Sequence, residues 1–151
     1  MTVADRRVAA LDLMMELVLL LGGDMTQSLA RDGLTVSRAH LLWELRHRGP
    51  STQRVLADAL GVSARTITGL VDGLATTGFV TREPHPTDRR ATLVTFTAHG
   101  AQITETMERG QRDLAQLLFA GIPADRFGHF TEVLGEVMTR LRAQIPPGEV
   151  L

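Results

Sequence analysis

The chain of 151 residues contains no cysteine and no tyrosine, and it has a single tryptophan. The lack of cysteine excludes disulfides, thiolate metal sites and cysteine-based redox sensing within this chain. With only 5 Phe, any core has to be built mainly from Leu, Val, Ile, Met and Ala. Hydrophobic residues make up 44% and charged residues 22%, which are ordinary values for a globular protein and favour one domain.

Long hydrophobic runs are also absent. The most apolar stretch, Val8 to Leu21, is interrupted by Asp12 and Glu16, and it is too short and too charged to span a bilayer. It lacks the small-residue cleavage pattern of a signal peptide. The sequence therefore predicts a cytoplasmic protein with no membrane partner.

The motifs of common enzyme classes are missing as well. We find no glycine-rich phosphate loop, no metal-ligand spacing and no nucleophile–base pattern, so we predict neither an enzyme nor a cofactor. His40, Glu44 and His47 lie close together in one predicted helix, but no fourth ligand is evident. We therefore predict no metal site.

The charge is unevenly distributed along the chain. Although the net charge is −1, residues 46–90 hold seven arginines and four acidic residues, which is a net charge of +3. The segments on either side are each net negative. Because the local field rather than the total charge attracts a polyanion, residues 46–90 are the candidate nucleic-acid surface.

Apolar spacing and chain-breaking residues predict a mainly α-helical fold with one small β-hairpin. The predicted helices cover residues 4–22, 37–48, 53–60, 63–77, 98–119 and 124–144. Gly22-Gly23 is expected to stop the first helix, leaving residues 24–33 as a short continuation that ends at Gly33. The predicted strands are 79–82 and 91–97, and the two prolines of the intervening EPHPTDRR loop are expected to keep it out of the sheet ladder.

Residues 51–78 carry the spacing of a helix-turn-helix. Ala57 leaves room for two helices to approach, Gly61 permits the left-handed turn, and Ile67 fills the interface between the helices. The same spacing is also compatible with a plain helical hairpin. On the outward face of the second helix, one arginine stands among short residues, so Arg65 is the candidate for reading a base.

Further DNA contacts are predicted around this helix and on the hairpin. The hydroxyls of Ser63, Thr66 and Thr68 can donate to phosphates or base edges, and Thr52 and Gln53 sit at a helix start that attracts phosphate. Arg82, Arg89 and Arg90 are the candidate DNA contacts of the hairpin. We expect Asp88 to orient the Arg90 guanidinium by a charged hydrogen bond, so that a hairpin arginine enters the minor groove. The alternative is a surface salt bridge that contributes only roughly 0–1 kcal/mol.

The stretch LTVSRAHLLWELRHRGPSTQRVLADALGVSARTITGLVDGLATTGFVTREPHPTDRRATLVTFTAHG resembles the MarR family of bacterial regulators. Its most specific pieces are GVSARTITGLVDGLATTGFVTR and the D-x-R hairpin followed by LVTFT. The order of the helices outside this stretch is similar too, so the resemblance covers nearly the whole chain. In that family the arginine of D-x-R binds DNA, which corresponds to Arg90 here, with Asp88 as its partner.

The resemblance implies a winged helix-turn-helix homodimer that regulates transcription, here predicted to be a repressor acting on a pseudo-palindromic operator. It implies one MarR-type domain over residues 1–151, with the DNA-binding region at 34–97 and dimerisation helices at 1–33 and 98–151. It also implies release by a small phenolic or other aromatic ligand. The cysteine-sensing branch of the family is excluded, because the chain has no cysteine.

Two groups of apolar residues follow from these expectations. The dimer should bury Leu11, Met14, Leu114, Leu117, Leu118, Val137 and Leu141, although some of these could instead close the core of a single chain. The candidate ligand pocket consists of Met14, Val18, His40, Trp43 and Arg46. Trp43 could equally serve packing.

Two other functions stay open at this point. One is an architectural DNA-binding protein with no ligand response. The other is a winged-helix module for protein–protein contact, which predicts a hairpin without the paired Arg89 and Arg90.

Overall fold

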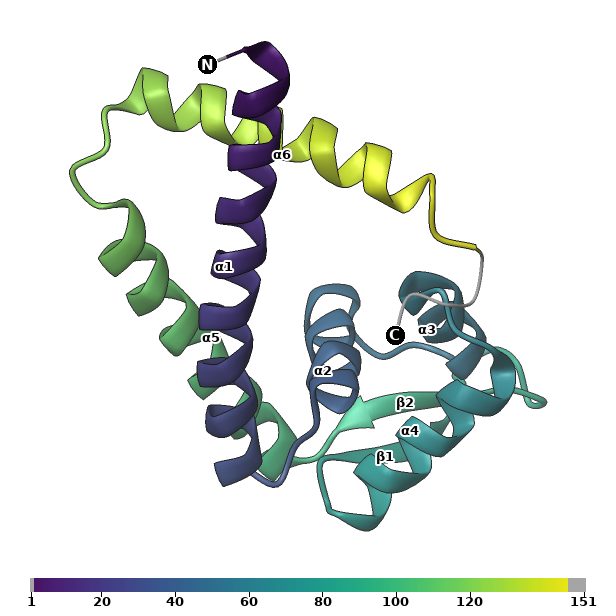
Figure 1. Ribbon diagram of the computed structural model, residues 1–151. Helices are drawn as coiled ribbons and strands as arrows, with labels where there is room; N and C mark the ends of the chain where they lie inside the picture. Colours follow the sequence, from purple (N-terminus) through teal and green to yellow (C-terminus); the bar gives the residue numbers. More distant parts are fainter. Residues whose placement is uncertain (1, 147–151) are drawn as a thin grey trace. The chain divides into compact units, whose positions relative to one another are not determined.

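The computed structural model describes residues 2–146 (Figure 1). In chain order the elements are α1 (Val3–Arg31), α2 (Val36–Arg48), α3 (Gln53–Leu60), α4 (Ala64–Thr76), β1 (Val80–Pro84), β2 (Thr92–Phe96), α5 (Ala98–Phe119) and α6 (Ala124–Arg142). The predicted helical fold with one antiparallel hairpin is confirmed. The chain divides into two compact units, Met1–Ala39 and His40–Leu151.

The first unit is dominated by α1, which is one continuous helix. Its start is fixed by a capping box, in which the Thr2 hydroxyl accepts the Asp5 amide hydrogen and the Asp5 carboxylate accepts that of Thr2. The prediction that Gly22-Gly23 would stop this helix is wrong. A glycine costs a helix only about 1 kcal/mol relative to alanine, and the strong helix formers on both sides outweigh that cost. The helix ends just before Gly33, whose φ of +73° is left-handed.

The second unit holds the helix-turn-helix around a leucine-rich core. The largest fully buried apolar side chains come from α2, α3, α4 and β2, and they are Leu41, Leu42, Leu45, Leu56, Leu60, Ile67, Val71, Leu74 and Val94. Ala57 is buried where α3 meets α4, and Gly61 has the left-handed φ of +65° that the turn requires. The predicted roles of Ala57, Gly61 and Ile67 are therefore confirmed.

The hairpin has a longer first strand than its sequence suggested. β1 and β2 pair antiparallel from Val80 opposite Phe96 to Pro84 opposite Thr92, so the prediction that Pro84 stays outside the ladder is wrong. Proline is tolerated because β1 is an edge strand and Pro84 is its last residue. On the other side of β2, Ser51 exchanges two backbone hydrogen bonds with Val94, which ties the start of α3 to the hairpin.

The first turns of α5 pack closely against the start of β1. Thr97 caps α5, and its hydroxyl also donates to the Gly78 carbonyl oxygen. A Cβ on Gly100 would overlap the carbonyl oxygen of Phe79, so only glycine fits there. The buried Thr104 hydroxyl is satisfied by the Gly100 carbonyl oxygen at 2.7 Å. The hairpin is therefore anchored at its base by α5.

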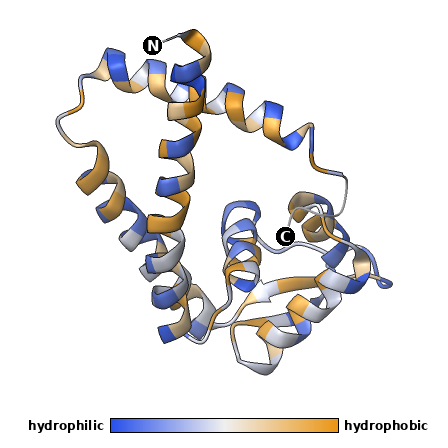
Figure 2. Cartoon of the chain, in the orientation of Figure 1, coloured by the Kyte–Doolittle hydropathy of each residue, from blue (hydrophilic) through white to orange (hydrophobic). Residues whose placement is uncertain are grey.

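The rest of α5 and all of α6 keep their apolar side chains at the surface. Figure 2 shows the strongly hydrophobic C-terminal end of α5, and no described residue of α6 is buried. Phe119, Phe127 and Phe130 cluster where the two helices meet, with ring centroids 5.1 to 6.4 Å apart. Of the residues expected in a dimer, Leu114, Leu117, Leu118 and Leu141 are exposed and Val137 is half-buried. On α1, Leu11 is exposed and Met14 is half-buried. None of these residues is buried within this one chain.

Candidate nucleic-acid interface

The helix α4 exposes the face predicted to read bases. Ser63 is its N-cap, and the Ser63 hydroxyl accepts the amide hydrogen of Thr66 at 3.1 Å. The Ser63 and Thr66 hydroxyls also lie 2.9 Å apart, within hydrogen-bond distance. Arg65 is exposed and takes part in no ion pair among the described residues. With Ile67, Val71 and Leu74 buried beneath it, α4 is fixed to the core by one side and open on the other.

A hydrogen-bonded network joins α3, α4 and β1 beside this face. The Arg82 guanidinium donates to the Gln53 side-chain oxygen at 2.9 and 3.2 Å and to the Asp72 carboxylate at 2.6 Å. The Gln53 amide nitrogen in turn donates to the Thr68 hydroxyl at 3.0 Å. Three of the predicted DNA contacts, Gln53, Thr68 and Arg82, therefore bind one another.

This network gives Arg82 a role within the chain. Its donors are directed to Gln53 and Asp72, which link the base of the hairpin to both helices of the helix-turn-helix. Asp72 was not anticipated from the sequence, because nothing in its spacing shows that a residue ten positions away would fold back onto it. At the start of α3, the Thr52 hydroxyl caps the helix by accepting the Val55 amide hydrogen.

The tip of the hairpin differs from the expected arrangement. Asp88 accepts a hydrogen bond from the backbone amide of Arg90 at 2.9 Å, and no ion pair joins it to the Arg90 guanidinium within residues 2–146. The predicted side-chain contact is therefore wrong. A carboxylate two residues before an amide closes a short Asx-type turn without any need for the longer guanidinium.

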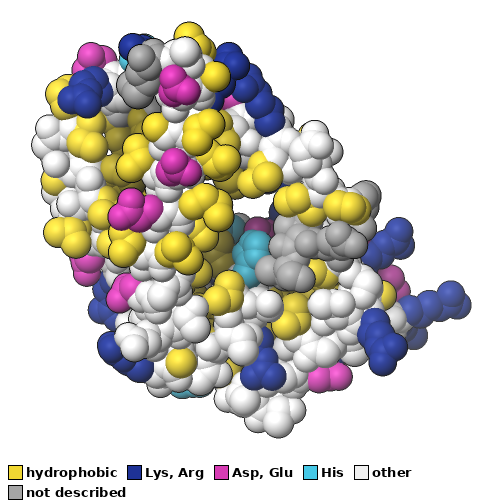
Figure 3. Space-filling view, viewed as in Figure 1, with side chains coloured by type: hydrophobic (Ala, Val, Ile, Leu, Met, Phe, Trp, Pro, Cys, Tyr) yellow, Lys and Arg dark blue, Asp and Glu magenta, His cyan; other side chains and the backbone are white. Residues whose placement is uncertain are grey.

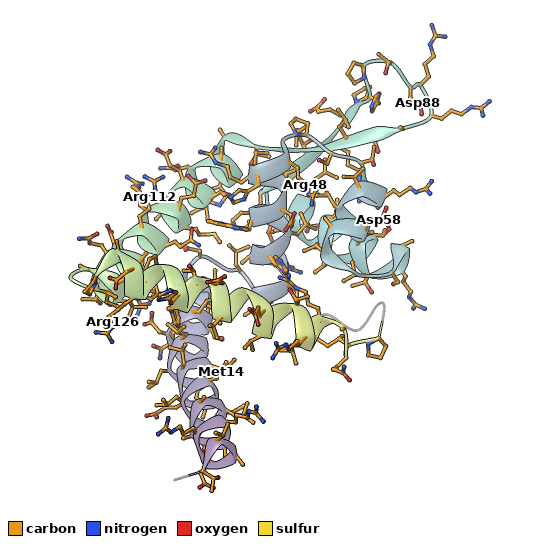
Figure 4. All side chains as sticks on the ribbon, turned by 90° about the horizontal axis from the view of Figure 1, so that it is seen from above. Met14, Arg48, Asp58, Asp88, Arg112 and Arg126 are labelled. Atoms are coloured by element: carbon orange, nitrogen blue, oxygen red, sulfur yellow. The ribbon has the colours of Figure 1, made fainter. Side chains whose placement is uncertain are left out.

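Both tip arginines are left exposed by this arrangement. Figure 4 places Asp88 at the far end of the hairpin, and Figure 3 shows basic side chains projecting from the surface. Arg89 and Arg90 are exposed and form no ion pair with another described residue. Two unneutralised guanidinium groups on a narrow hairpin can contact phosphates or enter a minor groove.

The residues of the predicted ligand pocket are divided between the two compact units of the chain. Met14 is half-buried and Val18 is exposed, and both belong to α1 in the first unit. His40, Trp43 and Arg46 follow one another along α2. The Trp43 ring packs on His47 with centroids 4.7 Å apart, and His47 Nδ1 donates to the Trp43 carbonyl oxygen. A pocket that combines α1 with α2 stays a prediction.

Arg46 connects α2 to α5. Its guanidinium binds the Glu108 carboxylate at 3.0 and 3.4 Å, and Arg112 approaches the same carboxylate at 3.4 Å. The hydrogen bond from Arg46 lowers the pKa of Glu108, and the same bond raises the pKa of Arg46. Arg46 also lines a shallow hollow with Leu45, Gly49, Pro50, Thr95 and Phe96. The partner Glu108 lies 62 residues away in the sequence, so no local pattern could have identified it.

The chain is similar in sequence to proteins of one known family. The MarR family model matches residues 34–92, which contain the helix-turn-helix and most of the hairpin. The multiple antibiotic resistance protein MarR of Salmonella typhimurium is 30% identical over 106 residues, covering 70% of this chain and 74% of that protein. The chain belongs to the MarR family.

A further relative and a solved structure agree with this assignment. The transcriptional repressor NicR of Pseudomonas putida is 35% identical over 83 residues, covering 55% of this chain and 52% of NicR, so the chain spans about half the length of that relative. A crystal structure of a mutant MarR from E. coli complexed with operator DNA matches with a TM-score of 0.68 and 25% identity. That match covers 91% of this chain and 99% of the other.

Membership of the MarR family settles the broad class. This is a winged-helix transcription regulator, and the prediction that the chain is not an enzyme is confirmed by its relatives.

Over residues 2–146, no helix has the length and apolar character needed to cross a membrane. Within the same residues, His, Asp and Glu side chains form no group of three that could hold a metal ion.

Proposed function

We propose that this MarR-family chain is a sequence-specific DNA-binding repressor that works as a homodimer. The observation that carries the proposal is that two exposed cationic elements lie within one compact unit. Arg65 is exposed on α4, and Arg89 and Arg90 are exposed at the hairpin tip. An α-helix fits the major groove and an arginine-tipped loop fits the neighbouring minor groove.

The surface of α4 suits close approach to base edges. Ala64, Thr66, Thr68 and Gly69 are short and exposed, so only Arg65 extends far from the helix near its start. The network of Arg82, Gln53 and Asp72 holds the hairpin and α3 in a fixed relation to α4. The solved complex of a mutant MarR of E. coli with operator DNA, whose fold this chain shares, supports a function in DNA binding.

A second copy of the chain accounts for the apolar surface of α5 and α6. Leu117 is 79% exposed, Val133 58% and Leu141 54%, and they belong to a larger group of exposed apolar side chains on these two helices. A two-fold dimer would cover them and would present two reading helices about 34–36 Å apart. We therefore propose an operator with two inverted half-sites.

The first test of this function concerns Arg65. A duplex is first selected from a random-sequence library by the unmodified protein, and it is called the selected duplex below. Arg65→Ala should weaken binding to it by roughly 1–3 kcal/mol per base contact and should relax the preference at one position of each half-site. Affinity measured on duplexes with single base changes checks this. If all positions weaken equally, Arg65 contacts only phosphate.

We extend the proposal to release by a small aromatic effector bound near α2. The supporting residues are Trp43, which offers a half-buried ring, and Arg46, whose guanidinium ties α2 to Glu108 of α5. An aromatic carboxylate that competed with Glu108 for the Arg46 guanidinium would weaken the contact between α2 and α5. Benzoate added to the complex with the selected duplex should lower the affinity of the unmodified protein. An equal loss with Arg46→Ala would contradict a role for this residue.

A further inference from the structure

The loop at the hairpin tip is organised around a histidine ring. His85 Nδ1 lies 3.2 Å from the backbone nitrogen of Thr87 and 3.1 Å from that of Asp88, so both amides donate to the same ring nitrogen. His85 is half-buried, whereas residues 86–90 are exposed. A ring nitrogen that accepts two consecutive amide hydrogens acts as the cap of a tight turn.

Two further hydrogen bonds join the backbone of the loop, and a third joins the Asp88 side chain to it. The His85 amide donates to the Ala91 carbonyl oxygen, and the Ala91 amide donates to the Asp88 carbonyl oxygen, each at 3.1 Å. The Asp88 carboxylate then accepts the amide hydrogen of Arg90. The backbone of Asp88 is therefore held by His85, and its side chain holds the backbone of Arg90.

We propose that His85 is a positioning residue, whose neutral imidazole sets the direction in which Arg89 and Arg90 leave the hairpin. This inference rests on the proposed DNA-binding function, because the arginines matter only if they reach DNA. His85 acts through the loop backbone and needs no contact with DNA of its own. The inference adds to the proposed function the residue that holds the hairpin tip in the conformation that binds DNA.

The chemistry of imidazole makes the proposal specific. Nδ1 can accept hydrogen bonds only when it carries no proton, with the ring hydrogen on Nε2. A protonated ring has donors at both nitrogens, so both amide bonds would be lost. The charged groups beside it in the hairpin are Glu83, Asp88, Arg89 and Arg90, and within residues 2–146 none of them forms an ion pair with the ring.

Two opposing effects of acid follow for DNA binding. Protonation would disorder the tip, but it would also add a positive charge near phosphate, which favours binding. Affinity at different pH values therefore cannot test the proposal by itself. The test needs variants that separate the acceptor from the charge, and it needs a measurement on the free protein.

The variants are His85→Ala and His85→Asn. Asparagine keeps an uncharged acceptor oxygen on a short side chain, whereas alanine removes the acceptor. With the selected duplex, alanine should weaken binding about tenfold or more, since the ring nitrogen that accepts both amides is lost in each subunit. Asparagine should remain within about threefold of the unmodified protein. Equal losses in both variants, or no loss in either, would overturn the proposal.

The measurement on the free protein is NMR of the backbone amides. The Thr87 and Asp88 amides should exchange slowly with solvent in the unmodified protein and faster in His85→Ala, while the Val80 amide in the strand stays unchanged. In His85→Asn, whose side-chain oxygen replaces the ring acceptor, both amides should keep their slow exchange. Thr87 and Asp88 amides that exchange equally fast in the unmodified protein and in His85→Ala would overturn the role of His85, whatever the effect on DNA binding. Protected amides in a protein that selects no duplex would instead overturn the proposed function.

Discussion

Leu117→Glu is expected to convert the dimer into monomers and to lower affinity for the selected duplex by about 100-fold or more. The side chain is 79% exposed in the single chain, so the substitution costs the folded subunit little. In the dimer the same carboxylate would be buried among leucines without a partner, which is strongly unfavourable. A monomer also loses the linkage between two half-sites, which contributes a factor of about 10²–10⁴ in comparable bivalent systems. Sedimentation equilibrium and titration with the selected duplex measure both effects.

Gln116→Glu is the matched control, because it adds the same charge to an exposed neighbouring position of α5. It should stay dimeric and should bind nearly as well as the unmodified protein. Circular dichroism of Leu117→Glu checks that the helices remain folded. A Leu117→Glu protein that is still a dimer, with undiminished affinity, would remove the α5–α6 surface from the proposed interface.

Arg90→Ala is expected to weaken binding to the selected duplex by about 100-fold or more and to flatten its dependence on salt. A hydrogen bond made by a charged group contributes about 1.5–3 kcal/mol, and a dimer loses two of them. Each arginine that neutralises a phosphate contributes about 0.9 to the slope of log affinity against log salt concentration. With two copies, the slope should therefore fall by roughly 1.8. Titrations between about 50 and 200 mM salt measure it.

Arg109→Ala provides the comparison, since Arg109 is an exposed arginine of α5 whose side chain donates only to Thr106 among the described residues. It should leave both affinity and salt slope unchanged. Arg89→Ala distinguishes the two tip arginines: a smaller effect than Arg90→Ala would identify Arg90 as the residue that enters the groove. If Arg89→Ala and Arg90→Ala both behave like Arg109→Ala, the hairpin has no part in binding.

The parts of the fold that depend on local chemistry could be predicted from the sequence. Thr52, Ser63 and Thr97 each cap one of the predicted helices, because a hydroxyl directly before an apolar helical pattern can accept an amide hydrogen. The crossing at Ala57 and Gly61 also follows from size and backbone freedom alone. The sequence-based predictions were wrong at two places where the residues concerned have only a small effect on the stability of a helix or strand. The pair Gly22-Gly23 weakens a helix without ending it, and Pro84 can occupy the end of an edge strand.

The candidate site was predictable in composition but not in its contacts. Exposed arginines near a helix-turn-helix can be read from the sequence, and Arg65, Arg89 and Arg90 are exposed. The partners of Arg82 and Arg46 could not be read, because each contact joins residues brought together only by the tertiary fold. The contact of Asp88 could not be read from the sequence either, although its partner is only two residues away. Spacing placed it beside Arg90, but only the loop geometry shows that it binds the backbone amide.

The symmetry of the DNA that this protein selects tests the central claim most directly. The measurement is repeated selection from a random-sequence duplex library by the unmodified full chain, followed by sequencing and hydroxyl-radical footprinting of the winning sequence. The account predicts two inverted half-sites whose centres are about one helical turn, or 10–10.5 base pairs, apart. It also predicts protection in the minor groove beside each half-site, where the hairpin tips lie. Selection of a single unpaired half-site, or no enrichment of any sequence, would contradict the account.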